Sequence, residues 1–169
     1  MEYFDVFNKN RKPLNKVMVR GTKLAPDEFN TGIEVYIIND NKLLMTQRAP
    51  EKSHSGEWEV PGGCSQAGES MDDTIKREIQ EEVNVKLESA DYKLVSTQMY
   101  NQQFVDIIQT KIPVDINNIK LQEEEVSAIK WVTEAEFKNM AIKNQVVASV
   151  LDRFNKCQSQ LDLNWETIN

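Results

Sequence analysis

Cysteine, histidine, glycine and proline are all scarce in this chain of 169 residues. Its two cysteines, Cys64 and Cys157, are too few for a disulfide framework, and neither has a second cysteine or a histidine at the spacing of a zinc site. Six glycines and five prolines leave no stretch that resembles a flexible linker. These absences exclude a disulfide-stapled fold and favour two reduced thiols in a single domain over residues 1–169, a length typical of one domain.

Long apolar runs and an excess of positive charge are also missing. The longest apolar stretches, such as residues 35–38, are far too short to cross a bilayer. Residues 1–5 are acidic and lack the basic start of a signal peptide, so we expect a soluble, cytoplasmic protein without membrane contact. The formal net charge of -7 argues against nucleic acid as a partner, because nucleic-acid binding needs a basic surface.

The chain does contain a clear succession of apolar patterns. Strands are expected over residues 3–7, 16–20, 34–38, 42–46, 92–100, 103–112 and 126–132, the pair at 34–46 forming a hairpin. Residues 48–68 carry repeated proline and glycine and predict a long loop, which in a compact domain is usually functional. Helices are expected over residues 71–83, 134–140 and 143–157. This order predicts an α+β domain in which helices cover a mixed β-sheet.

The helix expected over residues 71–83 has both of its ends marked in the sequence. Ser70 and Asp73 have the spacing of a capping box, and Asn84 stands where a left-handed residue ends a helix. Apolar residues recur every four positions and form one stripe, namely Met71, Ile75, Ile79 and Val83.

Three glutamates of this helix carry the chemistry that the sequence suggests. Glu78, Glu81 and Glu82 stand at positions i, i+3 and i+4, so their carboxylates share one face. Glu82 also lies beside the apolar stripe, where a carboxylate is costly unless a cation meets it. Hard oxygen ligands suit Mg²⁺, with Mn²⁺ as the alternative, better than zinc. A bound cation would also let an acidic protein recruit a phosphate compound. The opposing interpretation is an acidic helix face exposed to solvent.

The residues around these glutamates resemble the Nudix box, G-x5-E-x7-R-E-U-x-E-E-x-G-U, in which U is bulky and apolar. Residues 63–85 match in register at Gly63, Glu69, Arg77, Glu78, Ile79, Glu81, Glu82 and Val85. The one departure is Asn84 in place of glycine, and asparagine tolerates the same left-handed conformation. Residues 58–63 and 131–137 resemble the flanking segments of the family. The whole chain is most similar to MutT-like hydrolases on the branch related to isopentenyl diphosphate isomerase.

This resemblance implies an α/β/α sandwich with a mixed sheet, in which the box forms a loop-helix-loop. It implies a pyrophosphohydrolase that cleaves a diphosphate linkage in a nucleoside diphosphate-X or a similar small molecule, with Mg²⁺ or Mn²⁺ as cofactor. The implied metal ligands are Glu78, Glu81, Glu82 and the Gly63 carbonyl. The implied general base is Glu81 or Glu82, although family members also place the base on other loops.

Other residues are interpreted with their alternatives left open. Glu69 is expected to anchor the loop to the helix, and Arg77 to hold the carboxylate cluster together by pairing with its neighbours. Arg48 is interpreted either as a substrate-binding phosphate clamp or as a surface charge. His54 and Cys64 have no assigned catalytic role. The acidic run 123–125 is interpreted either as a solvated loop or as the source of a further metal ligand or of the base. The N-terminal strand pair over residues 3–20 could form the edge of a homodimer.

Two other functions compete with hydrolysis. Isomerases of the related branch carry a catalytic cysteine just before the box, whereas residues 59–63 contain none and Cys64 falls one residue inside the box. A non-catalytic module that senses nucleotides would be expected to have lost box glutamates, and all of them are present here. The sequence therefore favours the hydrolase, and its substrate remains unassigned.

Overall fold

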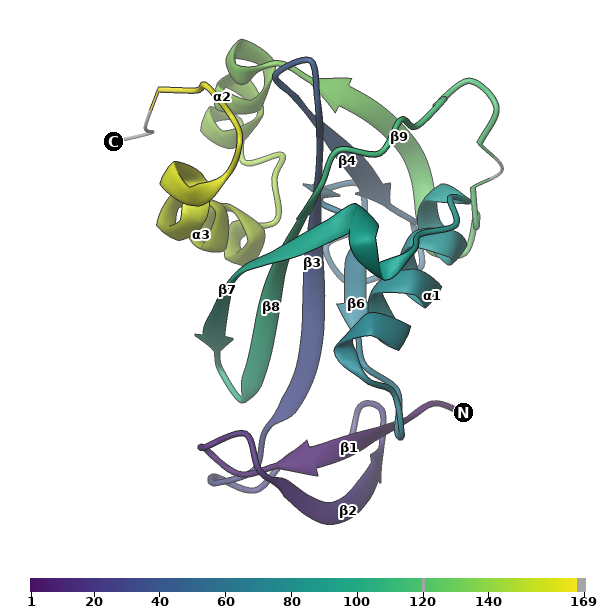
Figure 1. Cartoon of the computed structure of the whole chain (residues 1–169), viewed down its shortest axis with the longest axis vertical. Helices are drawn as coiled ribbons and strands as arrows, with labels where there is room; N and C mark the ends of the chain where they lie inside the picture. The colour runs from purple at the N-terminus through teal and green to yellow at the C-terminus, as the bar shows by residue number, and fades with distance from the viewer. Residues whose placement is uncertain (120, 167–169) are drawn as a thin grey trace.

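The computed structural model describes residues 1–119 and 121–166, and the elements follow one another through these residues as a mixed α+β fold (Figure 1). The strands are β1 (Tyr3–Phe7), β2 (Pro13–Val19), β3 (Asn30–Asn39), β4 (Lys42–Arg48), β5 (Trp58–Glu59), β6 (Gly62–Cys64), β7 (Tyr92–Tyr100), β8 (Gln103–Thr110) and β9 (Val126–Val132). The helices are α1 (Met71–Val83), α2 (Glu134–Ile142) and α3 (Ala148–Cys157), with short 3₁₀ turns at Ser89–Asp91 and Gln158–Gln160. None of these helices is long and apolar enough to span a membrane.

The long strand β3 is the centre of the main sheet. It runs parallel to β8 and antiparallel to β6, while β7 continues the sheet antiparallel to β8. On the other side, β3 pairs with β4 only beside their connecting turn, and β4 pairs antiparallel with β5 and β9. The mixed sheet that the sequence predicts is therefore confirmed.

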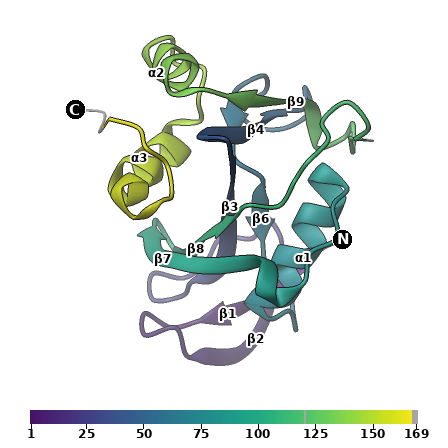
Figure 2. The same ribbon diagram turned by 45° about the horizontal axis from the view of Figure 1, so that its top comes forward.

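Alternation along β3 divides the interior into two apolar layers, because successive side chains of a strand point to opposite faces. Ile33, Val35 and Ile37 pack with the apolar stripe of α1. Tyr36 and Ile38 pack in a separate cluster that contains residues of α2 and α3. Figure 2 shows α1 on one side of the sheet and α3 on the other. The α/β/α sandwich is thus confirmed.

The ends of α1 are as predicted. The Ser70 side chain accepts a hydrogen bond from the Asp73 N–H, and the Asp73 carboxylate accepts one from the Ser70 N–H, which completes the capping box. At the other end Asn84 is left-handed, with φ 51° and ψ 36°. Ile75, Ile79 and Val83 are fully buried against the sheet. Burial of each contributes roughly 1.5–3 kcal/mol, so this stripe fixes the face that carries the glutamates.

Several element ends differ from the sequence-based prediction by two to four residues, and two segments differ more. The predicted loop 48–68 contains the strands β5 and β6, since β6 pairs with β3. The helix predicted from Lys143 begins only at Ala148. The reason is that the preceding segment is extended beside β5: the Trp58 N–H donates to the Gln145 carbonyl, and the Val147 N–H donates to the Trp58 carbonyl. Buried Val146 and Val147 follow the apolar pattern of a helix while packing as a strand.

The N-terminal hairpin of β1 and β2 forms a small sheet at the end of the molecule opposite α2 (Figure 1). Its first strand is bonded to the loop before α1, because the Ala67 N–H donates to the Tyr3 carbonyl and the Gly68 N–H donates to the Asp5 carboxylate. Its turn is tied to the main sheet by an ion pair between Arg11 and buried Asp106 of β8. The hairpin is therefore bonded to the loop before α1 through β1 and to the main sheet through its turn.

The helix end at Asn84 gives a stability prediction. Asn84→Ala should lower the free energy of unfolding by roughly 1 kcal/mol, since a residue with a Cβ and no local side-chain bond is strained at this φ. Asn84→Gly should cause no loss, because glycine adopts the conformation freely. Urea unfolding of the two variants beside the wild type measures both effects. Equal loss in both variants would show that the side chain, and not the backbone conformation, matters at this position.

Candidate active site

The glutamate face of α1 lines a small polar cavity of about 120 Å³ between the helix, the loop before it and the N-terminal hairpin. Its walls include Gly62, Gly63, Arg77, Glu78, Glu81, Glu82, Glu2, Arg20, Lys52 and Glu125. The structure thus brings together all three glutamates that the sequence placed on one face, and adds groups from the hairpin and from two loops.

Glu78 is held tightly against the glycine loop. The residue is 8% exposed, and a Cβ added to Gly63 would overlap the Glu78 carboxylate. Glycine is therefore the only residue type that lets the helix approach β6 this closely without displacing the carboxylate. Burial raises the pKa of Glu78, and the positive charges of Arg77 and Arg20 act in the opposite direction.

Glu82 is the more isolated of the two buried carboxylates. It is 6% exposed and accepts one hydrogen bond, from the Gly62 N–H at 3.2 Å. Within residues 1–119 and 121–166 it forms no ion pair with a basic side chain. Burial raises the pKa of Glu82 well above its ordinary value, and the nearby carboxylates of Glu78 and Glu59 raise it further. A carboxylate this buried and this poorly compensated either keeps its proton or binds a cation.

Arg77 is the hub of the charged network. Its Nε and Nη2 donate to the two oxygens of Glu69 at 2.6 and 2.9 Å, and Nη2 also donates to the Cys64 carbonyl at 3.1 Å. Its Nη1 donates to Glu78 at 2.8 Å and to Glu81 at 3.2 Å. Burial acts to raise the pKa of Glu69, but the bonds from Arg77 and neighbouring groups lower it overall. Arg77 and Glu69 thus join the loop to the helix, where the sequence placed a supporting pair.

The two remaining members of the predicted ligand set are Glu81 and the Gly63 carbonyl. Glu81 is more open than its neighbours, with 44% of its side chain exposed. The Gly63 carbonyl lies beside Gly32 of β3, where an added Cβ would stand 2.9 Å from the oxygen. In the described part of the chain no three His, Cys, Asp or Glu side chains already form a metal cage. Mg²⁺ does not require one, since it commonly uses one or two carboxylates together with waters and substrate phosphates.

The donor set therefore fits a hard divalent cation. Glu78 and Glu82 are one helical turn apart, both buried, and both have raised pKa values. Their oxygens match the preference of Mg²⁺ and Mn²⁺, whereas the softer ligands favoured by zinc are absent from the cavity lining. A bound cation would neutralise the poorly compensated charge of Glu82 and share Glu78 with Arg77.

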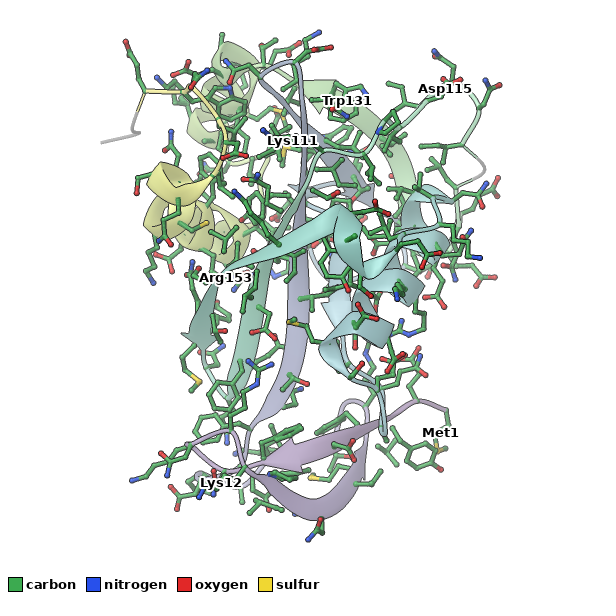
Figure 3. All side chains as sticks on the ribbon, viewed as in Figure 1. Met1, Lys12, Lys111, Asp115, Trp131 and Arg153 are labelled. Atoms are coloured by element: carbon green, nitrogen blue, oxygen red, sulfur yellow. The ribbon has the colours of Figure 1, made fainter. Side chains whose placement is uncertain are left out.

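A wider cleft of about 440 Å³ adjoins the glutamate cavity and shares Gly62, Gly63, Arg20 and Lys52 with it. Five basic side chains line this cleft, and each is paired with an acid: Arg20 with Glu2, Arg48 with Glu59, Lys52 with Glu125, His54 with Glu57, and Arg153 with Glu34. The Tyr100 ring, under the Arg153 guanidinium at 4.9 Å, forms part of the wall. Figure 3 labels Arg153 beside β7. The cleft therefore holds five basic side chains that an anion could bind if it displaced their acidic partners.

Arg48, the predicted phosphate clamp, lies on this cleft but is engaged. Its Nη1 donates to both oxygens of Glu59 at 2.7 and 2.8 Å, and its Nε donates to the Ser53 carbonyl at 2.6 Å. Only 16% of the side chain is exposed. Arg48 therefore holds the loop after β4 in place as it stands, and contact with a substrate would require exchange of Glu59.

Several of these groups carry no signal in the sequence. Arg20, Arg153 and Tyr100 come from a hairpin, a C-terminal helix and an edge strand that carry no box-like pattern. Lys52 lies in the loop flagged as functional by its length, and that length was the only available signal. Glu125 belongs to an acidic run whose first interpretation was a solvated loop, yet it lines the glutamate cavity and pairs with Lys52.

Comparisons with known proteins give matches to one family. The family model described as NUDIX domain matches residues 29–154. An uncharacterized Nudix hydrolase of Listeria monocytogenes is 28% identical over 151 residues, which cover 87% of this chain and 89% of the relative. A CTP pyrophosphohydrolase of Escherichia coli is 25% identical over 104 residues, covering 62% of this chain and 76% of the relative.

Solved structures share the fold. A crystal structure of a Deinococcus radiodurans protein superposes with a TM-score of 0.77 at 17% identity, covering 92% of this chain and 99% of that chain. A bifunctional NMN adenylyltransferase/ADP ribose pyrophosphatase of Francisella tularensis, complexed with AMP and a Mn ion, gives a TM-score of 0.64 at 16% identity. That match covers 78% of this chain and 42% of the Francisella chain.

The contact at Gly63 predicts that a substitution there weakens metal binding while the protein still folds. Gly63→Ala should displace the Glu78 carboxylate and weaken Mn²⁺ binding by about tenfold or more, because metal affinity depends on ligand placement. Calorimetric titration with Mn²⁺ measures the effect. Ser65→Ala is the matched control in the same loop, since it adds no atom and keeps the bond from the Ser65 N–H to the Thr31 carbonyl. Unchanged Mn²⁺ affinity in folded Gly63→Ala would contradict the placement of Glu78 as a ligand.

The burial of Glu82 predicts that the metal-free protein is strained at neutral pH. Because its folded-state pKa is raised, the destabilisation is absent below the ordinary value of 4.5, grows as pH rises from 4.5 towards the raised pKa, and is constant above it. Glu82→Gln should therefore raise the Tm of the metal-free protein at pH 7 by at least about 2 °C, and the gain should vanish below pH 4.5. Glu81→Gln, at an exposed position, should not raise it. A lower Tm for Glu82→Gln at pH 7 would show that the ionised carboxylate is stabilising.

Proposed function

The chain belongs to the NUDIX domain family, and from that membership we propose that it is a magnesium-dependent pyrophosphohydrolase of nucleoside diphosphates linked to another moiety. As a Nudix hydrolase it acts on diphosphate bonds. The observation that carries the proposal further is the pair of buried carboxylates, Glu78 and Glu82, packed beside the glycine loop with no cation of the protein against Glu82 in the described residues.

The metal requirement follows from these carboxylates. Glu78 and Glu82 would hold Mg²⁺ or Mn²⁺, with Glu81 and the Gly63 carbonyl as the further ligands that the Nudix box implies. The Francisella relative, which was crystallised with a Mn ion, supports a divalent cation of this kind. When bound there, such a cation would supply Lewis-acid chemistry: it would polarise the phosphoryl oxygens, lower the pKa of a water and offset the charge of the leaving phosphate.

The protein's own groups then have separate tasks. Glu82 or Glu81 would take the proton of the attacking water, and Glu125 is a third candidate because it lines the same cavity from another loop. Arg77 keeps Glu78 in place while bound to Glu69. Arg48 would contribute positive charge to the phosphates at the cleft, in exchange for its bond to Glu59.

The size and lining of the cleft favour a nucleotide. Its volume of about 440 Å³ lies within the range of small-molecule sites, and it combines an aromatic wall at Tyr100 with amides of Asn101 and Gln103. Relatives named for CTP and ADP ribose support nucleotides as the substrate class. The partner is thus a small diphosphate compound, and we propose no role for nucleic acid.

A homodimer through the N-terminal hairpin remains a prediction, for which Leu14 and Val17 offer exposed apolar side chains.

Phosphate and nucleotide release from a panel of diphosphates tests the proposal. The panel contains ADP-ribose, nucleotide sugars, dinucleoside polyphosphates, nucleoside triphosphates, coenzyme A and isopentenyl diphosphate, each with and without Mg²⁺. We expect Mg²⁺-dependent cleavage of one class, and a loss of about two or more orders of magnitude in Glu82→Gln, because a ligand or base is removed. Glu124→Gln, an exposed change in a neighbouring acidic loop, should keep wild-type turnover.

The other outcomes are equally specific. Near wild-type turnover in Glu82→Gln would show that Glu82 is not required for the reaction. Turnover of Glu125→Gln would then test Glu125 as the base. Silence across the panel with intact Mn²⁺ binding would favour the non-catalytic nucleotide sensor. Conversion of isopentenyl diphosphate without release of phosphate would favour the isomerase.

A further inference from the structure

The N-terminal hairpin lies outside the region matched by the family model, residues 29–154, yet it forms part of the candidate site. Backbone and side-chain bonds from Ala67 and Gly68 fix β1 against the loop that leads into α1. The two residues at the open end of the hairpin, Glu2 and Arg20, therefore reach the glutamate cavity. The family comparison alone gives these residues no role.

Arg20 stands where three hollows meet. It lines the glutamate cavity, the cleft of about 440 Å³, and a third hollow of about 220 Å³ between the hairpin and the box loop. Among the described basic residues it is the only one that lines all three. Its charge also reaches Glu78, whose pKa is raised by burial and lowered by Arg77 and Arg20. A phosphate held beside the α1 glutamates would thus lie within range of this guanidinium.

The present partner of Arg20 is weakly held. Its ion pair with Glu2 is half exposed on both sides, at 52% and 48% of the two side chains. By contrast, the Arg153 and Glu34 side chains are only 9% and 8% exposed. An exposed pair contributes little and is screened by salt, whereas a phosphate bound by a guanidinium fork is a strong, charge-assisted contact. Among the three arginines of the cleft, Arg20 is therefore the one that can most readily exchange its partner.

The exchange would not require the backbone to move. The Arg20 N–H donates to the Glu2 carbonyl at 2.9 Å and continues the ladder of β1 and β2. This bond holds the two residues side by side whether or not their side chains are paired. Arg77, the other guanidinium of the glutamate cavity, is committed to Glu69, Glu78 and the Cys64 carbonyl.

We propose that the N-terminal hairpin supplies a phosphate-binding subsite to the active site, in which Arg20 leaves Glu2 and binds an oxygen of the substrate diphosphate. Glu2 acts as a placeholder that competes with the substrate for Arg20. The subsite rests on the proposed function only in its choice of ligand, a diphosphate, and it makes no demand on which glutamate is the base.

Binding of methylenediphosphonate, a hydrolysis-resistant diphosphate, tests the subsite by calorimetry in the presence of Mg²⁺. Arg20→Ala should bind about ten- to a hundredfold more weakly than the wild type, the usual effect of losing a charged hydrogen bond. Glu2→Gln should bind about two- to fivefold more tightly, because the competing carboxylate is gone. Lys12→Ala is the control, since it removes an equal charge at the far end of the hairpin from Met1 (Figure 3).

Opposite signs in Arg20→Ala and Glu2→Gln, with Lys12→Ala unchanged, would establish the subsite even if no compound of the panel were hydrolysed, in which case the proposed function alone would fail. Wild-type affinity in Arg20→Ala, or failure of the wild type to bind the diphosphonate, would overturn the subsite. A lowered Tm in Arg20→Ala without a change in affinity would also overturn it, because the ion pair would then serve only to fasten the hairpin.

Discussion

The carboxylates of Glu78 and Glu82 lie one helical turn apart, almost wholly removed from solvent, and face the glycine loop at the start of β6. Burial of an ionised carboxylate without a basic partner costs several kcal/mol, and this applies to Glu82, whereas Glu78 is paired with Arg77. The fold nevertheless holds both groups there, since the apolar stripe of α1 fixes which face of the helix points away from the core. The apolar face of α1 thus stabilises the fold, whereas its glutamate face lowers the stability of the metal-free protein.

Every neighbouring element limits where those two carboxylates can go. Gly63 admits Glu78 because it has no side chain, and Arg77 joins the helix to the preceding loop through Glu69. The capping box at Ser70 starts the helix at a fixed residue. The hairpin then rests on that loop and adds positive charge from the open side. The carboxylates that would bind the metal are accordingly held in place, whereas Arg20, which would bind phosphate, can exchange its partner.

The sequence predicted what is encoded locally. Capping residues, apolar period and box spacing specified α1 and its glutamates, and alternation predicted most strands. It failed at Val146 and Val147, whose helical pattern is overridden by backbone pairing with Trp58. It also could not reveal Arg20 or Arg153 as cleft residues, because their positions at the cleft arise from tertiary packing of distant segments. Local patterns thus identify the chemistry, while the lining that selects a substrate depends on long-range contacts.

The most direct test of the central claim is a crystal structure grown with Mn²⁺, using the anomalous signal of the metal to locate it. The account predicts a Mn²⁺ peak within about 2.0–2.3 Å of carboxylate oxygens of both Glu78 and Glu82, with waters completing its shell. A peak coordinated by neither of these glutamates, or a site beside them left empty at a Mn²⁺ concentration that saturates binding in solution, would contradict it.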